Sequence, residues 1–384
     1  MTMDGAGHHV THYHFLKTEL SELFTSISLR EFAKRLINIF VPIYLINLGY
    51  GFMTTFIFMA IVSFAHVVSS YFAAKLSARI GFKHLIILSV PFLIIYYLLL
   101  NSINFVQSLG IPLVLIAIFG GISNGFFWIG YHTDFVKSTK RKDTGKKLGF
   151  VRILISLFQS LGPIVGAFLI AELSFHWVFI IVIAILIISV IPLLLRKDKH
   201  ERFKFSLKDI KFKFGLKAII AHMGKGIESS VYSLAWPIFI YFFILNKEIT
   251  LLGSVTSLSL IFSLIITYVI AKKIDKKINL FYKVSAFVNA IIWIIRGYLR
   301  TYLGVFIVDA IYGISNTTHT ISFNKICYDN ARKSKSILEY ITIREMIICG
   351  THTVMFLLLG LIGNFHIMFL IGTIGALMYL PYRD

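Results

Sequence analysis

Ionisable and aromatic side chains recur at helical spacing inside stretches of the chain that are otherwise apolar. The two longest series are Asp309, Tyr312, Asn316 and His319 or Thr320, and His222, Lys225, Glu228 or Ser229, Tyr232 and Trp236. Shorter series are Glu31, Arg35 and Asn38, and Asn124, Trp128 and Tyr131 or His132. Residues three and four positions apart lie on one face of a helix. Because a charge that faces lipid is costly, these faces are expected to point into a cavity or toward one another.

Carboxylates on such faces could take up protons, and cations beside them could bind an anionic solute. Asp309 is the predicted proton carrier, and Glu228 is predicted to form a charge pair with Lys225, one helical turn away. A simple intrahelical pair with no further role is the alternative for these two residues. Four charged residues near the start of the chain could equally form the foot of a helix at the membrane surface: Arg30, Glu31, Lys34 and Arg35.

The composition indicates the environment of these residues. Apolar residues make up 57% of the chain, charged residues make up 15%, and the mean hydropathy is +0.81. Soluble domains carry about 25% charged residues, and a helix that crosses a bilayer needs about 20 residues. The apolar blocks predict twelve spans: 26–49, 51–74, 84–103, 108–134, 147–171, 175–195, 216–245, 250–271, 280–299, 302–327, 336–361 and 365–382. The chain is therefore predicted to be an all-α membrane protein.

Lys and Arg residues fall almost entirely in alternate loops between these spans. Because positive loops stay in the cytoplasm, both termini are predicted to be cytoplasmic, in a cell (inner) membrane protein. The asymmetry accounts for the net charge of +20 without a nucleic-acid partner, and it could favour anionic lipid headgroups.

An internal repeat divides the chain into two halves. Gly121–Asn124 recurs residue for residue as Gly313–Asn316, half of the 384-residue chain away. The longest polar break falls between the sixth and seventh spans. The predicted organisation is an N-terminal tail (1–25), a first bundle of six helices (26–195), a basic central loop (196–215) and a second bundle of six helices (216–384).

Local motifs for cofactors and catalysis are absent from the sequence. No glycine loop is followed by Lys and Ser or Thr, so ATP is not the expected energy source, and the chain is not expected to be an enzyme. No metal or cofactor is expected in the spans, and Cys327 and Cys349 are expected to be free thiols. His66, alone on an apolar helix, is expected to be a packing histidine. The cluster His8, His9, His12 and His14 is interpreted as a solvated tail, with metal binding as the alternative.

The organisation as six plus six spans, with a basic central loop and cytoplasmic termini, resembles the major facilitator superfamily. The segment Ala74–Lys83 is similar to the family's motif after the second span, since Leu76, Arg79, Gly81 and Lys83 fit while the first Gly and the Asp are missing. The resemblance implies that such loops latch a cytoplasmic gate through charge pairs. The implied gating residues are Asp134, Arg152, Arg344, Glu345, Arg79, Gly81 and Asp275.

Residues 162–167 are similar to the fifth-span motif of the family's antiporters. Gly162, Pro163 and Gly166 match that motif, whereas Phe158 and Ala167 replace two of its glycines. Close packing of helices through small residues is the alternative explanation.

The resemblance implies a secondary transporter that works by alternating access, with the first, fourth, seventh and tenth spans around a central cavity. The leading prediction is proton-coupled export of a small, somewhat hydrophobic organic compound by a monomer. Import of a polar or anionic metabolite is the alternative, as is a sensor or assembly partner that does not transport. The predicted substrate- and proton-binding residues are Glu228, Asp309, Lys225, Asn124, Asn316, His319, Tyr232, Trp236, Trp128 and Arg35.

Overall fold

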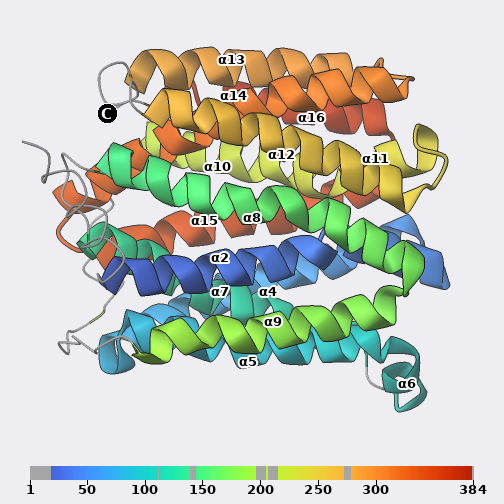
Figure 1. Cartoon of the computed structure of the whole chain (residues 1–384). Helices are drawn as coiled ribbons and strands as arrows, with labels where there is room; N and C mark the ends of the chain where they lie inside the picture. Colours follow the sequence, from blue (N-terminus) through green and yellow to red (C-terminus); the bar gives the residue numbers. More distant parts are fainter. Residues whose placement is uncertain are drawn as a thin grey trace, which may run out of the picture.

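The computed structural model describes residues 19–110, 112–138, 144–195, 205, 215–271 and 278–382. The described part of the chain is helical, and its long helices run roughly along one common direction (Figure 1). Six helical segments within it are long and apolar enough to cross a membrane. The first described helix begins at the left-hand end of the bundle in Figure 1. This end is called the α2 end below.

The first helix begins earlier than the sequence predicts. The helices of the first half are α2 (Glu19–Ile37), α3 (Val41–Leu45), η1 (Ile46–Tyr50), α4 (Gly51–Ile80), α5 (Phe82–Asn101), α6 (Ile103–Ser108), α7 (Leu113–Ser138), α8 (Thr144–Glu172) and α9 (Phe175–Leu195). Residues 19–25, assigned to the tail from sequence, belong to α2 because Leu23 and Phe24 are buried against the first half. Within this half α2 packs on α8 and α9, and α7 packs on α4 and α5.

The second half has the same kind of construction. Its helices are α10 (Leu216–Ser230), η4 (Val231–Ala235), α11 (Trp236–Phe243), α12 (Ile249–Ala271), α13 (Ile278–Arg296), α14 (Tyr302–Lys333), α15 (Ile337–Ile362) and α16 (Phe365–Leu377). Here α14 packs on α12 and α13, and α10 packs on α15 and α16. The predicted boundary between the halves, 196–215, lies almost entirely outside the described residues.

The predicted first and seventh spans are each interrupted, and each interruption adjoins a proline. Pro42 lies in the first turn of α3, and Pro237 lies in the first turn of α11. Proline has no backbone N–H to continue the hydrogen-bond ladder, so a helix bends or changes pitch beside it. Wide π-type turns occur next to both sites, at Ile46–Tyr50 and Val231–Ala235.

The repeated sequence motif makes the same contacts in both halves. A Cβ on Gly121 would lie 2.4 Å from the carbonyl oxygen of Val62 in α4, and a Cβ on Gly313 would lie 2.4 Å from that of Ser259 in α12. The Ser123 hydroxyl donates to the Ser89 carbonyl at 2.8 Å. In the same way Ser315 donates to Ser285 at 3.0 Å. The repeat is therefore a helix-packing element, in which glycine permits close approach and serine links a second neighbour.

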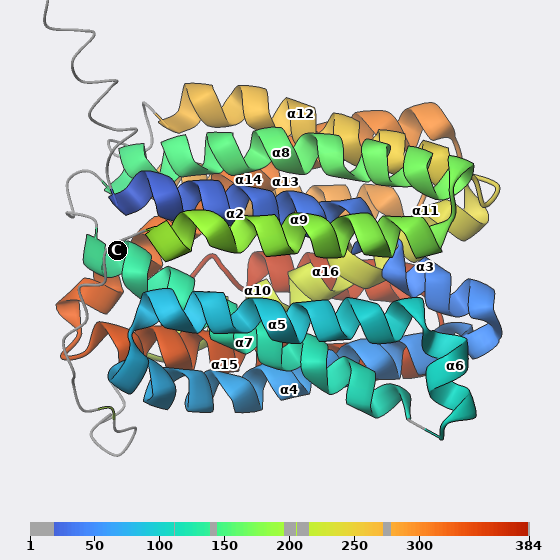
Figure 2. The ribbon, with the colours of Figure 1, turned by 60° about the horizontal axis from the view of Figure 1, so that its bottom comes forward.

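The two halves meet along two helix pairs. Helix α8 lies between α2 of its own half and α12 of the other half (Figure 1). Helix α15 lies beside α4 and α7 of the first half (Figure 2). The predicted packing residues belong to α8, where Gly162 faces the Cβ of Arg35 and Gly166 faces the backbone of Leu36 in α2.

We predict that Gly166→Ala lowers the stability of the folded protein. The added methyl carbon would lie 1.9 Å from the Leu36 carbonyl oxygen, so α2 and α8 would have to separate. Overpacking of this kind costs about 1–3 kcal/mol. Gly350→Ala is the matched control, because a Cβ there meets nothing within 4 Å. Thermal unfolding in detergent should show a lower melting temperature only for Gly166→Ala; equal melting temperatures would contradict the packing role.

Candidate functional site

Two adjoining cavities lie between the halves, in the middle of the bundle. Their volumes are about 500 Å³ and about 370 Å³. Both are lined by helices of the first half (α2, α4 and α7) and of the second half (α10 and the segment that follows it). Residues that line both cavities include Glu31, Lys34, Asn124, Trp128 and Ser229. Together the cavities form a mainly apolar chamber with several charged and polar side chains, shared by the two halves and called the central chamber below.

Most of the predicted binding residues line this chamber. Those that do are Arg35, Asn124, Trp128, Lys225, Tyr232, Trp236 and Asp309. Glu228, Asn316 and His319 line neither cavity. His319 is fully buried beside the rings of Tyr379 and Tyr282, with ring centroids 4.0 and 5.0 Å away. Parts of the predicted stripes thus line the chamber, and other parts of them pack against neighbouring helices.

Glu228 is a buried link among the helices of the second half. Glu228 is only 1% exposed. The carboxylate accepts hydrogen bonds from Tyr379 Oη (2.8 Å), Asn289 Nδ2 (3.0 Å), Tyr312 Oη (3.1 Å) and Trp293 Nε1 (3.3 Å). The sequence predicted an ion pair with Lys225, but these four donors are neutral. Lys225 instead donates to Thr320 Oγ1 at 3.4 Å and lines the chamber.

Asp309 forms an ion pair that the sequence did not predict. Arg296 Nη2 lies 2.6 Å from Asp309 Oδ1, and the indole N–H of Trp236 donates to Oδ2 at 3.0 Å. Arg296 is the last residue of α13 and is 0% exposed. The short connection between α13 and α14 makes these helices antiparallel neighbours, and the long arginine side chain can therefore reach Asp309. The separation of only 13 residues between Arg296 and Asp309, across a short loop, is the signal that sequence reasoning missed.

Aromatic rings surround the Arg296 guanidinium. Its central carbon lies 4.1 Å from the ring centroid of Tyr312, 4.3 Å from that of Trp293 and 4.4 Å from that of Trp236. Rings at this distance attract a cation through their negative faces. The Arg296–Asp309 pair is therefore stabilised both by opposite charge and by the aromatic surroundings, at the edge of the chamber that Asp309 lines.

The charged residues of α2 face inward rather than forming a solvated foot. Arg30 and Glu31 are 1% and 8% exposed, and Arg30 Nη1 lies 3.5 Å from Glu31 Oε1. Gln159 of α8 donates to the other Glu31 oxygen at 3.0 Å. Lys34 donates to Asn124 Oδ1 at 3.4 Å. Glu31 and Lys34 line the chamber and are site residues that the sequence left undecided, whereas Arg30 lies behind them over the ring of Phe127.

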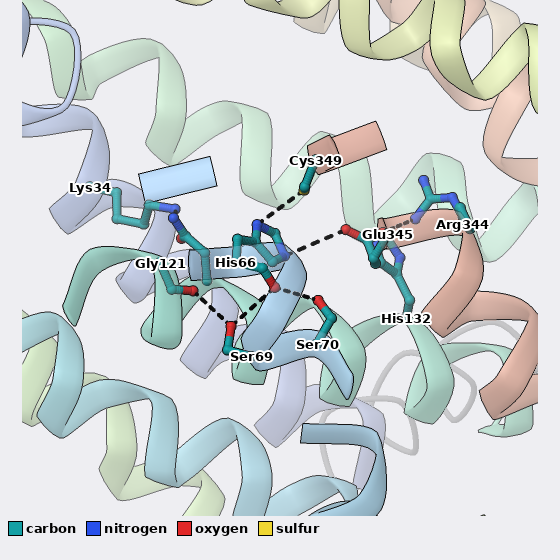
Figure 3. A network of polar contacts seen from close by, with 10 residues as sticks. Lys34, His66, Ser69, Ser70, Gly121, His132, Arg344, Glu345 and Cys349 are labelled. Atoms are coloured by element: carbon teal, nitrogen blue, oxygen red, sulfur yellow. Dashed lines mark hydrogen bonds and ion pairs between the residues drawn. The ribbon is translucent and has the colours of Figure 1, made fainter. Parts of the chain in front are cut away.

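A second polar network joins the two halves on the side of the chamber that faces the α2 end (Figure 3). His66 of α4 has Nε2 3.8 Å from Glu345 Oε2 and Nδ1 3.2 Å from Cys349 Sγ, both on α15. His132 of α7 has Nε2 3.5 Å from Glu345 Oε1. The prediction of an isolated packing histidine was therefore wrong for His66. No local motif could have shown this group, because its members come from distant parts of the chain.

The predicted gating residues have different places in the structure. Arg344 pairs with the neighbouring Glu345 and donates to Asn324 Oδ1 at 2.9 Å, and both charged residues line the larger cavity. Asp134 is buried in α7. The Arg152 side chain and Asp275 lie outside the described residues.

The two gating residues of the motif after the second span lie at a helix junction. Arg79 is in the last turn of α4. Gly81 links α4 to α5 with a φ of +86°, a backbone conformation that favours glycine. The presence of Gly81 is thus explained by the turn itself.

Contacts between the halves continue toward the α2 end. His132 Nδ1 lies 2.5 Å from the hydroxyl of Tyr328 in α14. Arg332 of α14 donates to the carbonyl of Val136 in α7 at 3.3 Å. A chamber between two similarly built helical halves, with such contacts between them, is the arrangement of a secondary transporter.

Comparison with known proteins agrees with this class. Residues 23–343 match the Major Facilitator Superfamily, so the chain belongs to that family of multi-pass membrane transporters. The predicted all-α fold of this family is confirmed. The family match does not show whether the chain belongs to the drug/proton antiporters within that family.

Solved structures of low sequence identity share the fold. The human organic anion transporter MFSD10 (TETRAN) is 10% identical, with a TM-score of 0.71 over 94% of this chain and 98% of that chain. The fucose:proton symporter FucP of E. coli is also 10% identical, with a TM-score of 0.71 over 94% and 96% of the two chains. A curated relative, the uncharacterized protein YqgE of Bacillus subtilis (strain 168), is 24% identical over 226 residues, which are 56% of this chain. The match spans about half of that relative, 51% of its length.

We predict that Asp309→Asn and Arg296→Gln each destabilise the protein, and that the double variant loses less stability than the sum of the two single losses. Each single change leaves one buried charge without its partner, which costs about 3–5 kcal/mol, whereas the double change removes both charges. Arg300→Gln is the control, because Arg300 lies four residues away and is exposed. Melting temperatures of the unmodified protein, the two single variants and the double variant test the coupling. Strict additivity would contradict a direct pair.

Proposed function

We propose that this protein is a secondary active transporter of a small organic anion, which alternates access to the central chamber by movement of its two halves. The observation that supports this proposal most strongly is the charge of the chamber lining. Lys34, Arg35 and Lys225 line the chamber from both halves. Each of these side chains is at most partly exposed, so a bound solute would meet them in a place with little competing water.

The carboxylates of the chamber have cationic neighbours of their own. Glu31 lies beside Arg30, Asp309 pairs with Arg296, and Glu345 pairs with Arg344. Glu31 also has Lys34 and Arg35 as charge neighbours. The six described cations Arg30, Lys34, Arg35, Lys225, Arg296 and Arg344 nevertheless outnumber these three carboxylates, so the surroundings of the chamber carry a positive excess. An anionic group on the solute would balance this excess through charge-assisted hydrogen bonds.

The remainder of the lining favours a partly apolar solute. Trp128 lines both cavities, and Tyr232 and Trp236 line the smaller one. Aromatic rings of this kind bind flat apolar surface, while the cations orient the anionic end. The fold shared with the organic anion transporter MFSD10 is consistent with this class of solute. Export of a hydrophobic compound is the second candidate, and the same aromatic residues favour it.

We propose protons as the coupling ion and Asp309 as their carrier. A proton on Asp309 would neutralise the carboxylate and weaken its ion pair with Arg296, 2.6 Å away. Arg296 would then lack its counter-ion, and an anionic group of a solute at the chamber edge beside Asp309 would be attracted to it. In this scheme the pair is the element that connects proton uptake to solute binding.

In the proposed orientation the α2 end faces the cytoplasm and the bundle crosses the cell membrane. The basic loops, which stay on the cytoplasmic side of a membrane, follow every second predicted span. Fifth-span residues Gly162 and Gly166 pack directly on α2. Their presence is therefore explained by helix packing, and the antiport direction does not rest on them.

Transport in proteoliposomes with an imposed pH gradient tests the proposed substrate. We expect accumulation of monocarboxylates with aromatic rings, and weaker transport of neutral or cationic compounds of the same shape. Lys225→Gln should raise KM for the anion about 10-fold, the effect of losing one hydrogen bond to a charged group. Lys325→Gln is the matched control, because Lys325 lies beside Asp329, which keeps Arg332 as a second partner. Equal transport of anionic and neutral compounds would contradict the proposal.

The coupling role of Asp309 has a separate readout. Asp309→Asn should abolish accumulation driven by a pH gradient, because the amide cannot carry the proton, while solute exchange across the membrane should remain measurable. Glu172→Gln, at the exposed end of α8, is the control and should accumulate solute normally. If Asp309→Asn still concentrates solute with the normal dependence on pH, another residue carries the proton.

A further inference from the structure

The group His66, Glu345 and Cys349, here called the interhalf cluster, contains three kinds of metal-binding side chain in one buried place. One ligand atom from each residue can be chosen so that all three atoms lie within 4.8 Å of one another. The residues are 7%, 5% and 3% exposed, and all three line the larger cavity of the central chamber. Figure 3 shows the His66 ring in contact with both α15 residues through its two nitrogens.

We propose that the interhalf cluster binds a zinc-like divalent cation. Nitrogen, sulfur and carboxylate oxygen are the donors that Zn²⁺ prefers, whereas Ca²⁺ and Mg²⁺ require oxygen alone. Ligands about 2.0–2.3 Å from a tetrahedral ion lie roughly 3.3–3.8 Å from one another. The separation of 3.8 Å between His66 Nε2 and Glu345 Oε2 lies at the upper end of this range. Cys349 Sγ contacts the other ring nitrogen, Nδ1, at 3.2 Å, so the thiolate would leave that contact to share the ion with Nε2.

An unsatisfied polar atom gives independent support. His66 Nε2 is buried and has no hydrogen-bond partner. Buried polar atoms normally have partners, and an orphaned one needs an explanation. This nitrogen faces Glu345 Oε2, the carboxylate oxygen that Arg344 does not contact, since Arg344 pairs with Oε1. An ion between the nitrogen and Oε2 would satisfy both atoms without displacing Arg344.

The three protein ligands leave one tetrahedral position for water or another small ligand. Glu345 and Cys349 are one turn apart on α15, so their side chains lie on one helix face. His66 approaches from α4. The cavity that all three residues line, about 500 Å³ in volume, gives the ion a path to the cluster and room for the fourth ligand.

Because the cluster joins the two halves, a bound ion would affect how the halves are placed relative to one another. His66 belongs to the first half and the other two ligands belong to the second, so a bound ion would link α4 to α15 directly. Separation of the halves on the α2 side would break that link. The bound ion therefore favours the conformation described above. The proposed binding does not depend on transport activity and can be measured on the purified protein.

Cobalt(II) is the probe for the test, because a thiolate ligand gives it a strong charge-transfer absorption in the near ultraviolet. The chain has 2 cysteines, and the histidine-rich tail contains neither of them. Full-length protein with His8, His9, His12 and His14 replaced by Ala should show this band, and one equivalent of Zn²⁺ should abolish it. Cys349→Ser should lose the band, and His66→Asn should weaken Zn²⁺ binding at least ~10-fold.

Cys327→Ser is the matched control. Cys327 is also buried and lies 3.7 Å from a histidine nitrogen, that of His222, but it is not part of the interhalf cluster. This variant should keep the band and the Zn²⁺ affinity. Zn²⁺ should also raise the melting temperature of the control and not that of Cys349→Ser, because an ion that binds only the folded state stabilises it.

The same experiments can overturn the proposal. Absence of the band in the protein with intact cysteines, or its loss in Cys327→Ser with retention in Cys349→Ser, would exclude the interhalf cluster as the site. X-ray absorption of the Zn²⁺ complex needs no cysteine variant, so misfolding of a variant does not obscure the answer. It should show one sulfur at about 2.3 Å; a shell of nitrogen and oxygen alone would also overturn the proposal.

Discussion

A charged side chain inside a bilayer needs an opposite charge or several hydrogen bonds around it, because lipid and packed protein cannot solvate it. The charges of this protein meet this requirement in different ways. Asp309 pairs with Arg296 inside an aromatic enclosure. Glu228 accepts hydrogen bonds from neutral donors on neighbouring helices. Each arrangement needs several helices in fixed positions, so the charges and the helix packing depend on one another.

The charge contacts divide according to the two halves. The pair Arg296–Asp309 lies wholly within the second half, at 2.6 Å, and the contact of Glu31 with Gln159 lies within the first, at 3.0 Å. Contacts of Glu345 with the histidines of the first half are longer, at 3.5 and 3.8 Å. Shorter contacts also join the halves: His132 Nδ1 lies 2.5 Å from the Tyr328 hydroxyl, and the Ile164 N–H donates to Ser257 Oγ at 2.9 Å. Rigid-body movement of one half against the other would break these interhalf contacts and leave the contacts within each half in place.

The internal repeat shows how one packing solution supports two different sites. Gly121 and Gly313 permit the same close approach, and Ser123 and Ser315 make the same hydrogen bond. The asparagine that follows each of these serines has different surroundings. Asn124 Oδ1 accepts a hydrogen bond from Lys34, while Asn316 Oδ1 has no hydrogen-bond partner. The backbone arrangement is thus shared between the halves, and the side chains around it set the distinct chemistry of each.

The sequence by itself determined the class of fold, the family and the faces that turn inward. Hydropathy, helical spacing and the repeat at Gly121 and Gly313 are properties of local order along the chain, so they can be read without coordinates. Only the tertiary structure decided which charges are partners. Lys225 is one turn from Glu228 in sequence, but the carboxylate is surrounded by neutral donors from other helices. His66 meets Glu345 and Cys349 because α4 packs on α15, and the packing of distant helices is set by the whole bundle rather than by any local pattern.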